Sequence, residues 1–388
     1  MKYASQYLQS AVTIIESYNG DIPLATFLKN FFSANKKFGS KDRKYIAQLC
    51  FAYFRLGHAA KEMPVADAIK KQLLLSNQGS DWQALFDDSS IPEVSLDTVF
   101  PFSNELSNGI DKEAFITNHF IQPDVFLRIR PGREEKMMNA LQQAGIGFHA
   151  MSTNTLAVSA GTKLDGVAQV NKDYVIQDYS SQQVGELLKK VKGERLKNEA
   201  EIVPSSLHPS PSTSIWDCCA ASGGKSILAK DILGNVDITV SDIRESILQN
   251  LQKRFKEAGI FNYKSIICDL SKKTDPRFQI ENYDLVICDA PCSGSGTWAR
   301  TPEQLYFFKK ERIAAFQKLQ QQIILNTINT VKPGGFYLYI TCSAFKKENE
   351  EQTNFIQANS ALRLVEQQII NGYTVHADTM FAALFKNS

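Results

Sequence analysis

Short apolar runs and amphipathic helical stretches alternate through the second half of the chain. Five runs have the length and composition of buried strands, namely 215–218, 237–240, 265–268, 285–288 and 336–340. Stretches with helical periodicity separate most of them, and the longest covers 309–331. Because alternation of buried strands with helices is typical of a doubly wound parallel sheet, this half is predicted to have an α/β fold.

The first part of the chain has helical periodicity instead. Four stretches show it: 3–17, 42–56, 65–75 and 111–120. They predict a helical domain over residues 1–120, in which Ser40 caps the second helix and Gly57 ends it. The domain carries a group of basic residues: Lys29, Lys36, Lys37, Lys41, Arg43, Lys44 and Arg55. These form either a solvated helix face or a surface that contacts RNA.

A change of pattern near residue 121 predicts a second, smaller domain. Strand-like and helical stretches alternate in it at 125–129, 133–143, 155–159, 174–176 and 180–191. We therefore predict a small α/β subdomain over residues 121–200. Its basic residues either follow an RNA backbone or serve solubility: Arg128, Arg130, Arg133, Lys189, Lys190, Lys192, Arg195 and Lys197. Pro and Ser dominate residues 201–214, a predicted linker, and the predicted domain of alternating strands and helices occupies 215–388.

Composition limits the function without identifying it. Hydrophobic residues make up 43% of the 388 residues and charged residues 22%, as in an ordinary folded protein. The net charge is only +2, so nucleic acid would have to bind to a local basic face. The N-terminus has no signal-peptide pattern, and no apolar stretch approaches about 18 residues. We expect a soluble cytoplasmic protein with no membrane partner.

The cysteines do not have the spacing of a metal site or a disulfide framework. There are seven: Cys50, Cys218, Cys219, Cys268, Cys288, Cys292 and Cys342. An odd number of thiols, crowded into one part of the chain, argues against structural disulfides. No zinc-type Cys-x-x-Cys or Cys/His spacing occurs, so no metal is predicted.

Two of these thiols follow strand-like runs. The run 285–288 leads through Asp289 and a proline turn to Cys292, and the run 336–340 leads to Cys342. Because parallel strands end at a common edge of a sheet, we expect this carboxylate and the two thiols to converge there.

Further polar groups are predicted at the same edge. The turn 219–225 between the first strand and its helix consists of small residues and paired glycines, so that the backbone can cradle a cofactor. It lacks the first glycine of a P-loop. Asp242 and Asp269 end the next two strands, where carboxylates can accept ribose hydroxyls and meet an adenine amino group. Each acid alone could be a helix cap, but three acids at strand ends, Asp242, Asp269 and Asp289, favour a nucleotide-like ligand.

Together, these motifs resemble those of the Sun-type RNA cytosine-5 methyltransferases, S-adenosylmethionine enzymes that include the RsmB ribosomal RNA methyltransferases. The matching residues are Cys219, Ala220, Ala221, Ser222, Gly223, Gly224, Lys225, Asp242, Asp269, Asp289, Ala290, Pro291, Cys292, Thr341, Cys342 and Ser343. Residues 177–181 resemble the family's segment before the catalytic domain, and 39–43 resemble the NusB-like extension of the RsmB branch. The resemblance implies a class I methyltransferase fold with a Rossmann-like doubly wound sheet, preceded by a helical NusB-like domain and an RRM-like α/β subdomain.

The resemblance also implies a role for each residue. A Cys342 thiolate would add to C6 of cytosine and make C5 nucleophilic, Cys292 would aid product release, and Asp289 would hold the ring. The implied cofactor-binding residues are Cys219, Ala220, Ala221, Ser222, Gly223, Gly224, Lys225, Asp242, Asp269 and Asp289. Lys225 would meet either the cofactor carboxylate or an RNA phosphate. DNA cytosine-5 methyltransferases use a Pro-Cys thiol for the addition, so Cys292 is the alternative nucleophile.

Some positions depart from the family's pattern. Ser222 stands where relatives usually carry Pro, which leaves the turn less rigid. Residues 378–381 replace a more usual Asp-Gly-Phe-Phe. Arg300 is a candidate for a phosphate or base contact. Asn349 and Glu350 either belong to the family's stretch after the catalytic Cys or form an exposed helix start.

We therefore predict an enzyme that methylates C5 of a cytosine in structured RNA. The helical extension makes 16S ribosomal RNA the first candidate substrate by analogy, with transfer RNA as the alternative. A monomer is expected. The competing hypothesis is a non-catalytic RNA-binding or ribosome assembly factor that keeps the fold, against which the intact Cys292 and Cys342 argue.

Overall fold

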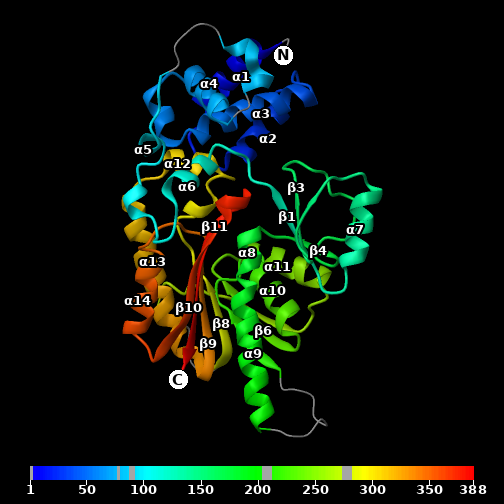
Figure 1. The fold of residues 1–388 in the computed structure, drawn as a ribbon, viewed down its shortest axis with the longest axis vertical. Coiled ribbons are helices and arrows are strands. Elements are labelled where there is room, and N and C mark those ends of the chain that lie inside the picture. Colours follow the sequence, from blue (N-terminus) through cyan, green and yellow to red (C-terminus); the bar gives the residue numbers. More distant parts are fainter. Residues whose placement is uncertain (1–2, 77–78, 87–91, 203–211, 273–281) are drawn as a thin grey trace. The chain divides into compact units, whose positions relative to one another are not determined.

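The computed structural model describes residues 3–76, 79–86, 92–202, 212–272 and 282–388, which form two compact units (Figure 1). The first unit comprises Met1–Pro123 and Ser295–Arg312, and the second comprises Asp124–Gly294 and Ile313–Ser388. Most of the predicted linker, residues 203–211, lies outside the described residues. In the described ranges, no helix combines the length and apolarity that crossing a membrane requires.

The first unit is helical, as the periodicity predicted. Its helices are α1 (Ala4–Glu16), α2 (Leu24–Ala34), α3 (Ser40–Arg55), η1 (Gly57–Glu62), α4 (Val65–Leu75), η2 (Gly79–Leu85), α5 (Leu96–Val99), η3 (Ser103–Glu105) and α6 (Lys112–Asn118). The prediction of Ser40 as a cap is wrong, because α3 already begins at Ser40. The Asp42 carboxylate instead accepts the Gly39 N–H at 2.9 Å. The turn after α3 does fall at Gly57, whose φ of +58° favours glycine.

A segment from the second half of the chain completes this unit. It holds η5 (Ser295–Thr297) and α12 (Pro302–Phe307). The buried Arg55 guanidinium donates to the carbonyl oxygens of Ala299 at 2.7 Å and His119 at 3.0 Å. Arg55 therefore belongs neither to a solvated face nor to an RNA surface, because its side chain is used inside the unit. Arg300, the candidate RNA contact, lies in the same segment.

The second unit begins with a small antiparallel sheet. Its strands are β1 (Val125–Ile129), β2 (His149–Ser152), β3 (Thr155–Val158) and β4 (Tyr174–Ile176), in the order β2-β3-β1-β4. Helix α7 (Glu134–Gln143) buries Met137 and Leu141 in the core of this sheet. Arg128, on β1, is 3% exposed and donates to Asp231 at 2.5 Å, and Arg130 donates to Asp231 at 2.6 Å. These two arginines are therefore structural and do not form the predicted phosphate track.

The larger sheet of this unit has seven strands in the order β10-β11-β9-β8-β5-β6-β7. They are β5 (Thr213–Asp217), β6 (Val236–Asp242), β7 (Tyr263–Ile267), β8 (Tyr283–Asp289), β9 (Val331–Thr341), β10 (Leu362–Asn371) and β11 (Thr379–Asn387). Strands β5 to β9 pair in parallel, which confirms the Rossmann-like α/β prediction. The sheet is not wholly parallel, because β11 runs antiparallel to both of its neighbours.

Helices cover both faces of the larger sheet (Figure 1). The helices are α8 (Tyr179–Gln183), α9 (Gly185–Ile202), α10 (Gly224–Leu233), α11 (Glu245–Glu257), α13 (Glu311–Thr327), η6 (Ile328–Thr330), α14 (Glu350–Ala358) and η7 (Gly372–Val375). Apolar side chains of α9, α10 and α11 form one core with the strands, and those of α13 and α14 form another on the opposite face. This three-layer arrangement leaves the carboxyl edge of the parallel strands free for a site.

The buried charges of Arg128, Arg130 and Asp231 allow a direct test of what joins the small sheet to α10. We predict that Asp231→Ala lowers the free energy of unfolding of the second unit by about 3–5 kcal/mol, because two guanidinium groups lose their buried partner. The measurement is hydrogen exchange of peptides from 124–176 and 224–233 in increasing urea.

The control for this substitution is Glu186→Ala, which removes an exposed ion pair with Lys189. A solvent-screened pair of this kind should contribute less than about 1 kcal/mol. Equal effects of the two substitutions would contradict the assigned role of Asp231.

Candidate functional site

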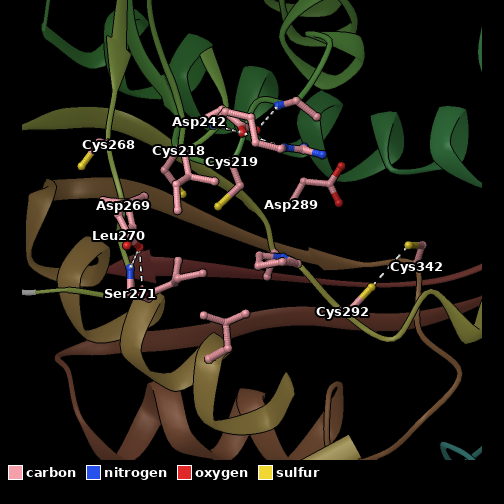
Figure 2. A pocket seen from close by; sticks show the side chains of 17 residues that line it. Cys218, Cys219, Asp242, Cys268, Asp269, Leu270, Ser271, Asp289, Cys292 and Cys342 are labelled. Atoms are coloured by element: carbon pink, nitrogen blue, oxygen red, sulfur yellow. Dashed lines mark hydrogen bonds and ion pairs between the residues drawn. The ribbon is translucent and has the colours of Figure 1, made fainter. Parts of the chain in front are cut away.

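A cavity of about 460 Å³ lies in the second unit, where the parallel strands end. Such a volume is in the range that small-molecule ligands occupy. The lining residues come from the segments after β5, β6, β7, β8 and β9 and from α13: Cys218, Cys219, Ala221, Asp242, Ile243, Arg244, Cys268, Asp269, Leu270, Ser271, Asp289, Ala290, Pro291, Cys292, Leu319, Ile323 and Cys342 (Figure 2). The predicted edge of the sheet is therefore where the structure forms a pocket.

The small-residue turn after β5 depends on glycine at one position. Gly223 has a φ of +82°, and a Cβ there would lie 2.6 Å from the ring of Phe255. Next to it, Arg254 donates to the carbonyl oxygen of Ser222 at 2.9 Å and to its hydroxyl at 2.7 Å. The turn thus gains from Arg254 a constraint that proline would otherwise supply at Ser222.

Asp217 braces the same turn from inside the sheet. It is the last residue of β5 and is fully buried, and this burial raises the pKa of its carboxyl to about 7. The Ser226 hydroxyl donates to it at 2.5 Å. The end of β5 is therefore tied to the first turn of α10.

Two of the predicted acids face the cavity from neighbouring strand ends. Asp242 ends β6, and its carboxylate accepts the N–H groups of Ala221 and Arg244, each at 3.0 Å. Asp269 follows β7 and accepts the Ser271 hydroxyl at 2.6 Å. This bond, together with the ammonium of Lys272, lowers the pKa of Asp269 below its usual value. Both acids can therefore act as hydrogen-bond acceptors for a ligand in the cavity.

Lys225, which was predicted to meet either the cofactor carboxylate or an RNA phosphate, is not among the residues that line the cavity. Its ammonium is largely buried and lies 3.0 Å from Asp289 Oδ2. It also donates to the Ser181 hydroxyl at 2.8 Å. A buried ammonium needs a negative partner, so Lys225 holds the Asp289 carboxylate in place near the loops that carry Cys292 and Cys342.

The two predicted thiols meet in the cavity. The sulfur atoms of Cys292 and Cys342 are 3.3 Å apart, although 50 positions separate them in the sequence (Figure 2). Strands β8 and β9 pair in parallel, with Asp289 opposite Ile340, so both loops leave the sheet side by side. The Cys342 sulfur beside it, together with burial, raises the pKa of the Cys292 thiol.

The loop that carries Cys292 is held by a buried carboxylate that the sequence analysis missed. Glu348 is fully buried and accepts the Ser293 N–H at 2.8 Å. Gln320, on α13, donates to Glu348 at 3.2 Å and to the Pro291 carbonyl oxygen at 3.1 Å. Burial raises the pKa of Glu348. Hydrogen bonds thus hold the backbone on both sides of Cys292.

The loop that carries Cys342 is held by the next residue along the chain. Asn349 accepts the Thr341 hydroxyl at 2.5 Å and donates to the Ser343 carbonyl oxygen at 2.9 Å. Asn349 is fully buried, and its amide bonds to both neighbours of Cys342. The alternative of an exposed helix start is therefore wrong for this residue. The charged run 346–351 hid this role, since such runs are usually solvated.

The predicted set divides into residues at the cavity and residues behind it. Cys219, Ala221, Asp242, Asp269, Asp289, Cys292 and Cys342 line the cavity. Ala220, Ser222, Gly223, Gly224 and Lys225 are not among the lining residues. The apolar lining residues that were not predicted are Ile243 and Leu270, next to strand-end acids, and Leu319 and Ile323 on α13. Composition alone does not distinguish these from core residues.

Comparison with known proteins gives a match over the second half of the chain. The family model described as 16S rRNA methyltransferase RsmB/F matches residues 204–384. A Vibrio vulnificus protein named ribosomal RNA small subunit methyltransferase B is 31% identical over 160 residues, which are 41% of this chain and 37% of that protein. The chain spans only 35 to 53% of the length of such curated relatives.

Solved structures show the fold. The crystal structure of PH0851 aligns with a TM-score of 0.72 at 17% identity, covering 98% of each chain. A methyltransferase homologue from Pyrococcus horikoshii aligns with a TM-score of 0.59 at 17% identity, covering 82% of this chain and 98% of that one. These likenesses support the class I methyltransferase fold. Over residues 204–384, the chain is therefore similar to the RsmB/F methyltransferases.

Proposed function

We propose that the protein transfers a methyl group from S-adenosylmethionine to C5 of a cytosine in small-subunit ribosomal RNA. The observation that carries the proposal is the pair of thiols, Cys292 and Cys342, 3.3 Å apart at the edge of a ligand-sized cavity. The RsmB/F match over 204–384 supports the RNA class. Two thiols suit this chemistry because the reaction needs one group to form a covalent bond to the base and another to help break it.

The cavity fits the cofactor. In this kind of sheet, a carboxylate at the end of the second strand accepts ribose hydroxyls, and Asp242 has that position at the end of β6. Asp269 can accept a hydrogen bond from an adenine amino group. Apolar walls for a base come from Leu270 and Ile323. When bound, S-adenosylmethionine supplies an electrophilic methyl group.

Cys342 is the proposed nucleophile. Its thiolate adds to C6 of the cytosine ring, and the electron pair of the C5–C6 double bond moves toward N3 and raises electron density at C5. The raised pKa of Cys292 keeps a proton on that sulfur, where it can be donated to the Cys342 sulfur 3.3 Å away.

Asp289 is proposed to hold the cytosine ring during the addition. Its carboxylate lines the cavity and is positioned by the Lys225 ammonium. It can accept a hydrogen bond from the amino group or from a protonated N3, where charge develops. After methyl transfer, the C5 proton passes to a base such as water, and the electron pair of the C5–H bond re-forms the C5–C6 double bond. Cys342 then leaves C6 as a thiolate, and Cys292 is proposed to assist this release.

The first prediction from this proposal concerns the affinity for S-adenosylmethionine. We expect Asp242→Asn to weaken S-adenosylmethionine binding at least tenfold in calorimetry, because an acceptor for the ribose hydroxyls and for the Ala221 N–H is altered. Asp237→Asn, at the exposed opposite end of the same strand, should leave the affinity unchanged. Equal affinities of the two variants would argue against this cofactor site.

The second prediction concerns the reaction. We expect transfer of a tritiated methyl group to small-subunit ribosomal RNA isolated from cells that lack this gene. On RNA containing 5-fluorocytosine, Cys342→Ala should abolish covalent trapping. Cys292→Ala should instead allow adducts to accumulate with unmodified RNA, because release is impaired.

The matched control is Cys268→Ala, since Cys268 lines the same cavity but lies after β7. This variant should trap RNA as the unaltered chain does. Trapping that survives the loss of Cys342 and vanishes with Cys292 would reverse the two roles. Cofactor binding without transfer to any cellular RNA would instead favour a non-catalytic factor.

The third prediction concerns Glu348 as a positioning residue. Because Glu348 fixes the Ser293 N–H, we expect Glu348→Ala to lower kcat about 10- to 100-fold while KM for S-adenosylmethionine stays within about twofold. Glu348→Gln keeps an oxygen acceptor and should restore most of the rate. Glu351→Ala, three positions along, is the control and should have little effect on kcat. Failure of the Gln variant to recover activity would contradict a role through hydrogen bonding.

A further inference from the structure

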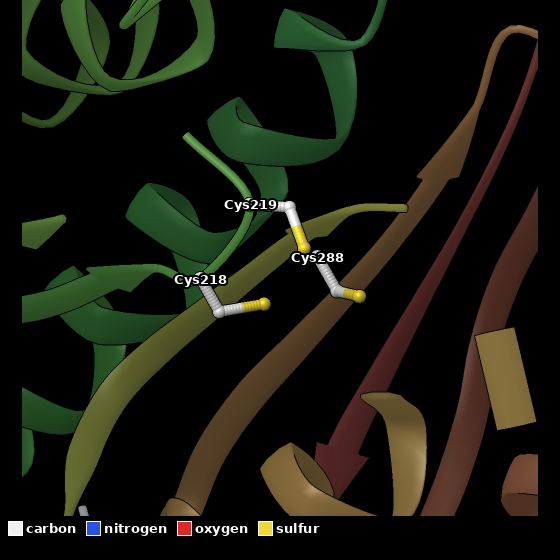
Figure 3. A group of neighbouring side chains, drawn as sticks. All are labelled: Cys218, Cys219 and Cys288. Carbon is white, nitrogen blue, oxygen red and sulfur yellow. The ribbon is translucent and has the colours of Figure 1, made fainter. Parts of the chain in front are cut away.

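Three other cysteines meet beside the thiol pair. The sulfur atoms of Cys218, Cys219 and Cys288 all lie within 4.8 Å of one another (Figure 3). Cys218 and Cys219 lie directly after β5, and Cys288 lies in β8. A metal site needs at least three His, Cys, Asp or Glu side chains with their ligand atoms close together. Among the described residues, these three cysteines meet that condition.

Strand register explains why two of these side chains are neighbours. Strands β5 and β8 pair in parallel with Asp217 opposite Ile287, and the Cys218 N–H bonds to the Ile287 carbonyl oxygen at 2.9 Å. The next positions, Cys218 and Cys288, therefore point to the same face of the sheet, where both belong to one core cluster. Cys219 then adds its sulfur from the turn.

The spacing of the sulfur atoms suits a thiophilic metal ion. A zinc–sulfur bond is about 2.3 Å long, so thiolates around one ion lie about 3.8–4.0 Å from each other in tetrahedral or trigonal arrangement. Sulfur atoms within 4.8 Å of one another reach that spacing by shifts of about 1 Å or less. Thiolates select soft ions such as Cu⁺ and Zn²⁺ over Mg²⁺ or Ca²⁺, which prefer oxygen ligands.

An ion can reach these sulfur atoms through the cavity. Cys218 and Cys219 line it, whereas Cys288 is fully buried behind them. Burying a cation is costly unless it is paired with negative groups, and three thiolates meet that condition. The sequence analysis predicted no metal because the cysteines lack zinc-type spacing along the chain. That rule could not detect this group, because Cys288 follows Cys218 by 70 positions.

We propose that Cys218, Cys219 and Cys288 form a binding site for a thiophilic cation of the Zn²⁺ or Cu⁺ type. Each S–H group exchanges its proton for a bond to the metal, so one ion binds with the release of three protons and no change in oxidation state. A tetrahedral ion would take its fourth ligand, such as water, from the cavity.

The metal and the cofactor should compete, because two of the three thiols line the cavity that also contains Asp242. By thermodynamic reciprocity, each ligand then weakens the binding of the other by the same factor. This competition rests on the proposed cofactor site, whereas metal binding by the three thiols does not. The two ideas can therefore fail separately.

The test uses the full chain with Cys292→Ala and Cys342→Ala, so that the other thiol pair cannot bind the probe. Cd²⁺ is titrated without oxygen, and its ultraviolet sulfur-to-metal absorption counts the bound thiolates. We expect one Cd²⁺ per chain with three thiolates, displaceable by Zn²⁺. Cys218→Ser and Cys288→Ser should each remove about one third of the absorption and weaken binding at least tenfold. Cys50→Ser, at a buried thiol of the helical unit, should change neither.

A second measurement needs no substitution and so does not depend on whether the variants fold. In the unaltered chain, saturating Zn²⁺ should slow the alkylation of Cys219, the partly exposed member of the group, at least tenfold, and leave Cys268 unchanged. Undiminished alkylation of Cys219, or Cd²⁺ absorption that persists unaltered without Cys218 and Cys288, would overturn the site. Metal binding that is indifferent to saturating S-adenosylmethionine would overturn the competition alone.

Discussion

The site depends on the parallel register between β8 and β9. With Asp289 opposite Ile340, two strands that are distant in sequence end at the same level of the sheet, and the loops that follow start side by side. Register alone does not fix a loop, because each residue beyond a strand regains conformational freedom. The buried neighbours Glu348 and Asn349 remove that freedom, one from the Cys292 loop and the other from the Cys342 loop. A sulfur separation of 3.3 Å follows from these constraints together.

Two cationic side chains near the cavity hold neighbouring groups in place. Lys225 is used to hold Asp289, and Arg254 holds the backbone and hydroxyl of Ser222. A proline at that position, which the resemblance leads one to expect, would restrict the backbone through its own ring, whereas this chain restricts it through a hydrogen-bonded guanidinium. A departure from the family's pattern is thus accompanied by a local compensation that only the folded chain reveals.

Sequence patterns predicted the elements whose signals are local. The buried parallel strands, the amphipathic helices and the strand-end acids follow from periodicity and from the ends of apolar runs. Strands β10 and β11 were not predicted, and the antiparallel direction of β11 depends on its pairing with β9 and β10, which no local pattern encodes. The pairing of Arg128 with Asp231 joins residues 103 positions apart, so no local pattern marked either side chain as buried.

The same limit applies to the site. Asp289, Cys292 and Cys342 were identified through motifs, whereas Glu348 and Asn349 lay inside a charged run that is normally solvated. Likewise, the segment Ser295–Arg312 follows the Cys292 motif directly but packs with the helical unit, because Arg55 offers buried donors to its backbone. Function that arises from long-range packing becomes visible only when the partners are brought together.

The most direct measurement of the central claim is to locate the covalent bond. A complex trapped on RNA containing 5-fluorocytosine can be digested with protease and nuclease, and the peptide that carries the nucleotide can be sequenced by mass spectrometry. The account predicts the modified base on Cys342. A base attached to Cys292, or to any thiol outside this pair, would contradict it.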